Sequence, residues 1–150
     1  MGADNKKIMS AREYLQRLKS LDYQVTIKIS ELNELNEIIT ALGSSASDVK
    51  VQTSGTSDKT GNLAIRLTEL QKQAIEKCNE WATQKIEALK LINKMEDRRY
   101  QSVLNLYYLQ NKTFNETAEK MGVSYQWVNV LHKNAVAEFA EIMHENGLCG

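Results

Sequence analysis

The 150-residue sequence contains no proline, and its two cysteines, Cys78 and Cys149, lie far apart. Because proline interrupts helix interiors, a proline-free chain with many charged, leucine, isoleucine and alanine residues favours long helices and an all-α fold. Two isolated cysteines match neither a disulfide framework nor the ligand spacing of a zinc site. These absences favour a reducing setting, such as the cytoplasm.

The sequence also lacks a charge excess and a long apolar run. Its 19 Lys and Arg residues balance its 19 Asp and Glu residues. No apolar stretch approaches the roughly 20 residues that a membrane-spanning helix needs. Lys6 and Lys7 are not followed by the apolar segment of a signal peptide. We therefore expect no membrane partner and a cytoplasmic location.

The residue combinations of catalytic and cofactor sites are missing as well. His132 and His144 have no partnering cysteine or carboxylate motif around them. There is no nucleophile with a base, no convincing carboxylate pair and no glycine-rich loop that could hold a phosphate. We expect that the protein is not an enzyme and that it has no metal site and no cofactor.

Apolar residues recur in alternating steps of four and three along the first part of the chain, with Lys28 in one of the core-type positions. These residues are Tyr14, Leu18, Leu21, Val25, Leu32, Leu35, Ile39 and Leu42. Such a heptad pattern, sustained over about four heptads, predicts a coiled-coil-like helix. We expect this helix to start near Ile8, after a flexible tail at 1–7, and to end at Gly43.

A second helix with a similar apolar stripe is predicted from about Asn62 to Met95. Its stripe includes Leu63, Leu67, Leu70, Ala74, Cys78, Trp81, Leu89 and Ile92. Two long helices in sequence pair naturally as an antiparallel hairpin, here over 8–95. Two paired helices bury little apolar surface between them. The apolar stripe that remains exposed should therefore dock on the last domain or on another copy of the chain. The predicted core of the hairpin or oligomer comprises Leu18, Leu21, Val25, Leu32, Leu35, Ile39, Leu67, Leu70, Ala74, Cys78 and Trp81.

The connection between these helices, 43–61, is rich in Ser, Thr and Gly, with Val49 and Val51 as its only large apolar residues. This composition favours a flexible linker. A loop that makes functional contacts is the alternative, because the segment is unusually long for a helix connection.

The last domain, 96–146, carries the most specific pattern, and 147–150 follow it as a tail. Asp97 can cap a helix over 98–109. Thr113 and Glu116 form a capping box at the start of the next helix, and Gly122 and Ser124 supply a turn and a new N-cap. With Ala118, Val128 and Leu131 at their offsets, this spacing is typical of a DNA-binding helix-turn-helix. Any three-helix subdomain with a glycine turn is the alternative.

The outward residues of the second helix of this motif are suited to reading bases, since Gln and Asn can pair with adenine and Lys can reach guanine. The predicted base-contacting residues are Ser124, Tyr125, Gln126, Asn129 and Lys133. The predicted phosphate-contacting residues are Lys112, Thr113, Lys120 and His132. Trp127 could lie against the sugar-phosphate backbone, but we expect it to pack on the helix over 98–109. The alternative for the whole face is an ordinary solvated surface.

The segment YQSVLNLYYLQNKTFNETAEKMGVSYQWVNVLHKNAVAEF, residues 100–139, resembles region 4 of bacterial sigma factors. The matching positions are Val103–Leu104, Tyr107–Tyr108, Thr113, Glu116–Thr117–Ala118, Gly122–Val123–Ser124, Val128, Ala135 and Phe139. The whole chain is also similar to small phage-encoded late transcription regulators of Gram-positive bacteria. The resemblance implies binding to promoter DNA and to RNA polymerase in a bacterial host cell.

The sequence departs from complete sigma factors in two respects. No segment resembles the region that melts the promoter, and the predicted recognition helix lacks the arginines that sigma factors place there. Residues 96–150 contain five Lys and Arg against seven Asp and Glu, a net charge of −2. Because phosphate neutralisation drives non-specific affinity, a lone copy should bind DNA weakly.

The expected function is that of a sequence-specific regulator of transcription that binds double-stranded DNA, acting as a homo-oligomer, with a dimer favoured, or together with RNA polymerase. One alternative is a small terminase-type subunit for DNA packaging. Another is a protein whose helix-turn-helix contacts only RNA polymerase.

Overall fold

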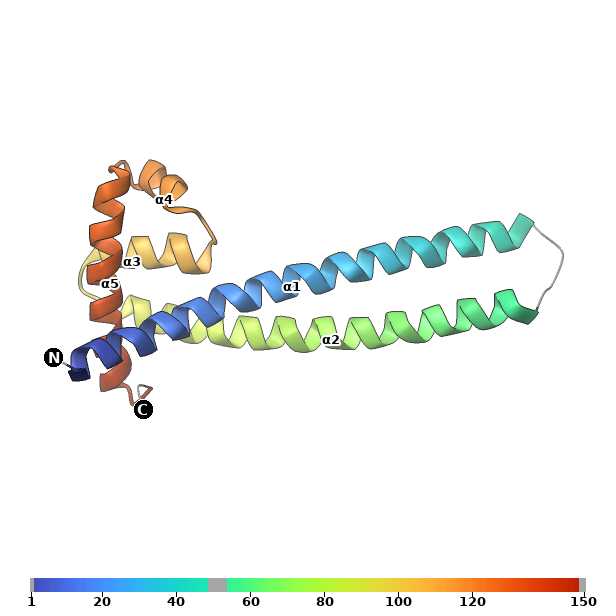
Figure 1. Cartoon of the computed structure of the whole chain (residues 1–150), viewed down its shortest axis with the longest axis horizontal. Coiled ribbons are helices and arrows are strands. Elements are labelled where there is room, and N and C mark those ends of the chain that lie inside the picture. The colour runs from blue at the N-terminus through green and yellow to red at the C-terminus, as the bar shows by residue number, and fades with distance from the viewer. Residues whose placement is uncertain (1, 49–53, 149–150) are drawn as a thin grey trace. The chain divides into compact units, whose positions relative to one another are not determined.

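The computed structural model of the chain describes residues 2–48 and 54–148, and within them the side chains of 11–42, 59 and 61–148 (Figure 1). These parts contain only helices and their connections. The helices are α1 (Gly2–Asp48), α2 (Ser54–Asn93), α3 (Arg98–Leu104), a π-helical turn η1 (Asn105–Leu109), α4 (Phe114–Met121) and α5 (Tyr125–Glu145). The all-α prediction is confirmed.

Both long helices extend further than the sequence pattern predicts. α1 includes residues that were expected to form a tail at 1–7, and α1 and α2 together cover both ends of the expected loop at 43–61. The segment 43–61 has no proline, and each of its three glycines, Gly43, Gly55 and Gly61, costs only about 1 kcal/mol inside a helix. Val49 and Val51 lie outside the described residues.

The chain divides into two compact units whose bounds differ from the predicted division near residue 96. One unit combines Met1–Leu21 with Ala82–Gly150, and the other is Asp22–Trp81. The first turns of α1 and the last turns of α2 thus belong with α3, α4 and α5. Tyr14 shows why: its hydroxyl donates to Glu87 Oε1 at 2.8 Å, and its ring lies 5.8 Å from that of Phe139.

Apolar burial in the first unit comes from every helix that contributes to it. Its buried side chains include Ala11, Leu15, Leu18, Leu21, Ala88, Leu91, Ile92, Val103, Leu104, Tyr108, Val128, Leu131, Ala135, Val136 and Phe139. Leu18 and Leu21 are therefore core residues, as predicted, but of this unit. The heptad pattern could not distinguish the two units, because one continuous helix supplies apolar residues to both.

The second unit, 22–81, is less completely buried. Val25, Leu35 and Ala74 are buried. The other predicted core residues of this unit are half-buried: Leu32, Ile39, Leu67, Leu70, Cys78 and Trp81. Lys28, in its core-type position, pairs with Glu31 at 3.5 Å. Several large apolar side chains are exposed, among them Tyr23 at 67% and Ile75 at 61%. Among the described residues, no helix is long and apolar enough to cross a membrane.

Candidate functional site

The start of α4 is held by two reciprocal hydrogen bonds. The backbone N–H of Glu116 donates to Thr113 Oγ1 at 3.1 Å, and the N–H of Thr113 donates to Glu116 Oε1 at 3.2 Å. This is the predicted capping box. The bond from the Thr113 backbone favours the charged carboxylate and lowers the pKa of Glu116. The first turn of α4 therefore has a defined position.

A tight turn connects α4 to α5. Gly122 adopts the left-handed conformation, with φ +69°. Its N–H donates to the carbonyls of Ala118 and Glu119, while that of Val123 donates to Ala118 at 3.0 Å. Ser124 Oγ then accepts from the N–H of Trp127 at 3.1 Å and caps α5. The predicted roles of Gly122 and Ser124 in the turn are confirmed.

One face of α5 is buried along its length. Val128, Leu131, Ala135 and Phe139 are almost completely shielded from solvent. They pack in the region where α5 contacts α3 and α4. Because this face is fixed, the opposite face of α5 is presented to solvent.

The predicted base-contacting residues lie on or beside that outward face. Gln126 and Lys133 are exposed, and Tyr125 is 46% exposed. Asn129 is half-buried, and its Nδ2 donates a long hydrogen bond of 3.4 Å to the Tyr125 carbonyl. Ser124 is exposed, but its hydroxyl oxygen already serves as the helix cap.

Two exposed residues of this surface were not among the predicted base contacts. Val130, 44% exposed, lies between Gln126 and Lys133 on the same stripe, and Trp127 is 42% exposed beside it. Trp127 is thus partly exposed, and its packing on the helix over 98–109 stays a prediction. On an α-helix a neighbouring residue is rotated by about 100°, and this places Trp127 on the flank next to buried Val128. The helical spacing of Gln126 and Lys133 could have pointed to Val130.

His132, a predicted phosphate contact, is half-buried. It lies in a ring cluster with Tyr107, Tyr108 and Phe114, at centroid distances of 5.5, 5.6 and 5.1 Å. Burial, and then the positive charges of Arg12 and Lys19, lower the pKa of His132 to about 4. A neutral imidazole offers no charge to a phosphate, but its N–H can still donate a hydrogen bond, so the phosphate contact of His132 stays a prediction.

The π-helical turn η1 contributes two rings to the cluster, those of Tyr107 and Tyr108. The sequence predicts one continuous helix over 98–109, but its last turn is widened, with the N–H of Gln110 donating to the Asn105 carbonyl at 2.9 Å. Tyr107 and Tyr108, adjacent in sequence, both turn toward the cluster, with their centroids 4.7 Å apart. A regular helix would separate neighbouring side chains by about 100°.

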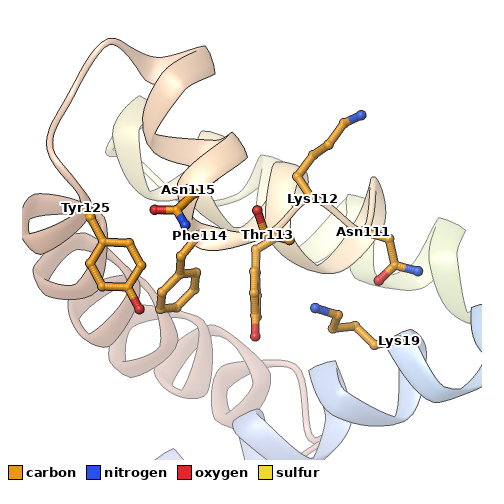
Figure 2. A pocket seen from close by; sticks show the side chains of 8 residues that line it. Lys19, Asn111, Lys112, Thr113, Phe114, Asn115 and Tyr125 are labelled. Atoms are coloured by element: carbon orange, nitrogen blue, oxygen red, sulfur yellow. The ribbon is translucent and has the colours of Figure 1, made fainter.

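Two of the other predicted phosphate contacts, Lys112 and Thr113, line an open hollow at the start of α4 (Figure 2). Its lining residues are Lys19, Tyr107, Asn111, Lys112, Thr113, Phe114, Asn115 and Tyr125. Lys19 Nζ lies 3.6 Å from the centroid of the Tyr107 ring. Lys112 extends away from Lys19 in Figure 2. Lys120 is exposed in the last turn of α4. Sequence reasoning missed Lys19, since no local motif connects α1 with α4.

The two units differ in charge. The unit of 1–21 and 82–150 has 13 Lys and Arg against 10 Asp and Glu, or +3, whereas 22–81 has 6 against 9, or −3. Residues 96–150 alone have a net charge of −2. The unit as a whole is positive because α1 and α2 add basic residues, among them Arg12, Arg17 and Lys19 of α1. In addition, no acidic residue occurs from Val123 to Ala137. The outward face of α5 can therefore approach an anionic surface.

Comparisons with known proteins give one match. Neither the curated proteins nor the solved structures include a chain that matches this one. A family model matches residues 40–140, which contain α3, α4 and most of α5. The chain belongs to the family described as "Protein of unknown function (DUF1492)".

Proposed function

We propose that the protein is a sequence-specific DNA-binding regulator of transcription, in which α4, the turn at Gly122 and α5 form a helix-turn-helix. The observation that carries this proposal is the joint geometry of the turn. A capping box, a left-handed glycine and a capping serine set the start of α5, and buried Val128 and Leu131 set its rotation. A recognition helix needs both to be defined, since its first turns enter the major groove.

The electrostatics of this unit support a nucleic-acid partner. Its net charge of +3 and the absence of acidic residues from 123 to 137 reduce repulsion from phosphate. Lys112 lies beside the start of α4, where the helix dipole favours a phosphate. The similarity of residues 100–139 to sigma region 4 supports the same partner and adds RNA polymerase as a second one.

Residues 8–95 are proposed to form a coiled-coil-like antiparallel hairpin that joins two copies into a dimer. Five residues separate α1 from α2, and such a short connection is typical of antiparallel neighbours. The unit of 22–81 also exposes Tyr23, Ile38, Ile65 and Ile75. A second copy could cover this apolar surface, and dimerisation would strengthen binding to a two-part DNA site.

Selection of host genomic fragments by the purified protein tests this function. Binding of a selected fragment and a scrambled one is then measured by fluorescence anisotropy over a range of salt concentrations. The wild type should prefer the selected fragment. Gln126→Ala should cost about 1–3 kcal/mol on that fragment alone, whereas Lys133→Ala should reduce the salt slope by about one. Lys72→Ala, in the acidic unit, is the control and should change neither.

Equal affinity of the wild type for both fragments would contradict sequence-specific recognition. The mass in solution provides a second criterion. A dimer agrees with the proposal, and a large ring would favour a DNA-packaging subunit instead.

A further inference from the structure

The outward stripe of α5 consists of four residues, at helical offsets of zero, three, four and seven. They are Gln126, Asn129, Val130 and Lys133. Positions with these offsets lie on one side of an α-helix. Three of the four are polar or charged, and the fourth is a valine near the centre of the stripe. This arrangement combines hydrogen-bonding groups with one small apolar surface.

Val130 is one of several large apolar side chains that the described helices expose, and it is the one within the outward stripe of α5. It is 44% exposed. A β-branched side chain lowers helix propensity, and apolar surface in contact with water adds a further cost. The buried face of α5 does not require this residue, because Val128 and Leu131 already supply the inward contacts. Val130 therefore places an apolar side chain on the outward stripe although the packing of α5 does not need one there.

Among the base edges of the major groove, the C5-methyl of thymine is the one apolar group. We propose that Val130 contacts the methyl group of a thymine and thereby selects thymine at one position of the DNA site. This inference rests on the proposed function. Gln126 and Lys133, on the turns before and after Val130, provide hydrogen bonds to neighbouring bases or phosphates. A purely apolar partner would leave both side chains without such acceptors.

The test replaces the thymines of the selected fragment by deoxyuridine, one at a time, so that only the methyl group is removed. For the wild type, substitution at one position should weaken binding about three- to tenfold, the effect expected from exposing one methyl group. For Val130→Ala, the thymine and deoxyuridine fragments should bind equally at that position. Leu148→Ala removes an apolar side chain of similar exposure, 43%, outside both α5 and the proposed dimer surface, and should retain the wild-type difference.

The possible outcomes distinguish a failure of the thymine contact from a failure of the proposed DNA-binding function. If the wild type prefers the selected fragment but no deoxyuridine weakens binding, the inference is overturned and the proposed function stands. If the deoxyuridine effect persists in Val130→Ala, another residue reads the methyl group, and the inference is again overturned. If the wild type does not distinguish selected from scrambled DNA, the proposed function itself fails. Thermal melting of Val130→Ala, expected to match the wild type, shows that the comparison concerns folded protein.

Discussion

The Tyr108 hydroxyl lies 2.6 Å from Nε2 of His132, and this contact joins the π-helical turn η1 to α5. Burial raises the pKa of Tyr108 and lowers that of His132 to about 4. At neutral pH the phenol is therefore protonated and the imidazole uncharged, and the tautomer of the imidazole decides which of the two groups donates. The contact helps to hold α5 in place against η1, and the opposite, exposed face of α5 is the one that we propose to read DNA.

This pair predicts how stability depends on pH. An unfolded histidine titrates near pH 6.5, and His132 in the folded chain titrates near 4. Between these values the unfolded state binds more protons, so the free energy of unfolding should fall as pH decreases from 7 to 4. Because the ring is partly exposed, we expect a contribution of about 1–2 kcal/mol rather than the full shift.

Urea unfolding at pH 7.0 and 4.5 measures this contribution. His132→Gln keeps a hydrogen-bond acceptor for Tyr108 but cannot be protonated, so its stability should decrease less over the same interval. His144→Gln, at an exposed position of α5, is the matched control and should follow the wild type. Identical profiles for wild type and His132→Gln would show that His132 is not neutral in the folded state.

Gly122 should be sensitive to substitution because of its backbone and not because of crowding. An added Cβ at Gly122 would meet no atom within 4 Å, but its φ of +69° is unfavourable for other residues. Gly122→Ala should therefore lower the free energy of unfolding by about 1–2 kcal/mol. Gly61, inside α2, is equally open, and Gly61→Ala should be neutral or stabilising because alanine favours helix. Equal effects at both positions in thermal denaturation would argue against the left-handed turn.

Thr117 offers a stabilising substitution. Its side chain is buried, and Oγ1 has no hydrogen-bond partner among the described residues. Valine has nearly the same shape without the hydroxyl, so Thr117→Val should raise the free energy of unfolding by about 0.5–1 kcal/mol. Thr113→Val is the contrasting variant, since Thr113 Oγ1 caps α4 and its loss should cost about 0.5–2 kcal/mol. Chemical denaturation measures the free energy of unfolding of both variants. A value for Thr117→Val below that of the wild type would show that the Thr117 hydroxyl has a hydrogen-bond partner after all.

Local features of the fold were predictable because they depend on neighbouring residues. The absence of proline and the apolar periodicity indicated an all-α chain, and Thr113, Gly122 and Ser124 marked the ends of α4 and α5. Caps and left-handed glycines act over three or four residues, so their chemistry is visible in the sequence. Gln126 and Lys133 could be assigned to the exposed face because Val128 and Leu131 define the opposite one.

Tertiary packing decided what local patterns could not. His132 is polar in sequence, but in the folded chain it contacts Tyr108, and burial lowers its pKa to about 4. Lys19 lies more than 80 residues before Tyr107 in the sequence, yet its ammonium group lies 3.6 Å from the centroid of the Tyr107 ring. The heptad pattern continued through α1 without showing that Leu18 and Val25 belong to different compact units. Burial and charge at these positions arise from residues distant in sequence, so only the folded chain brings together the groups that determine them.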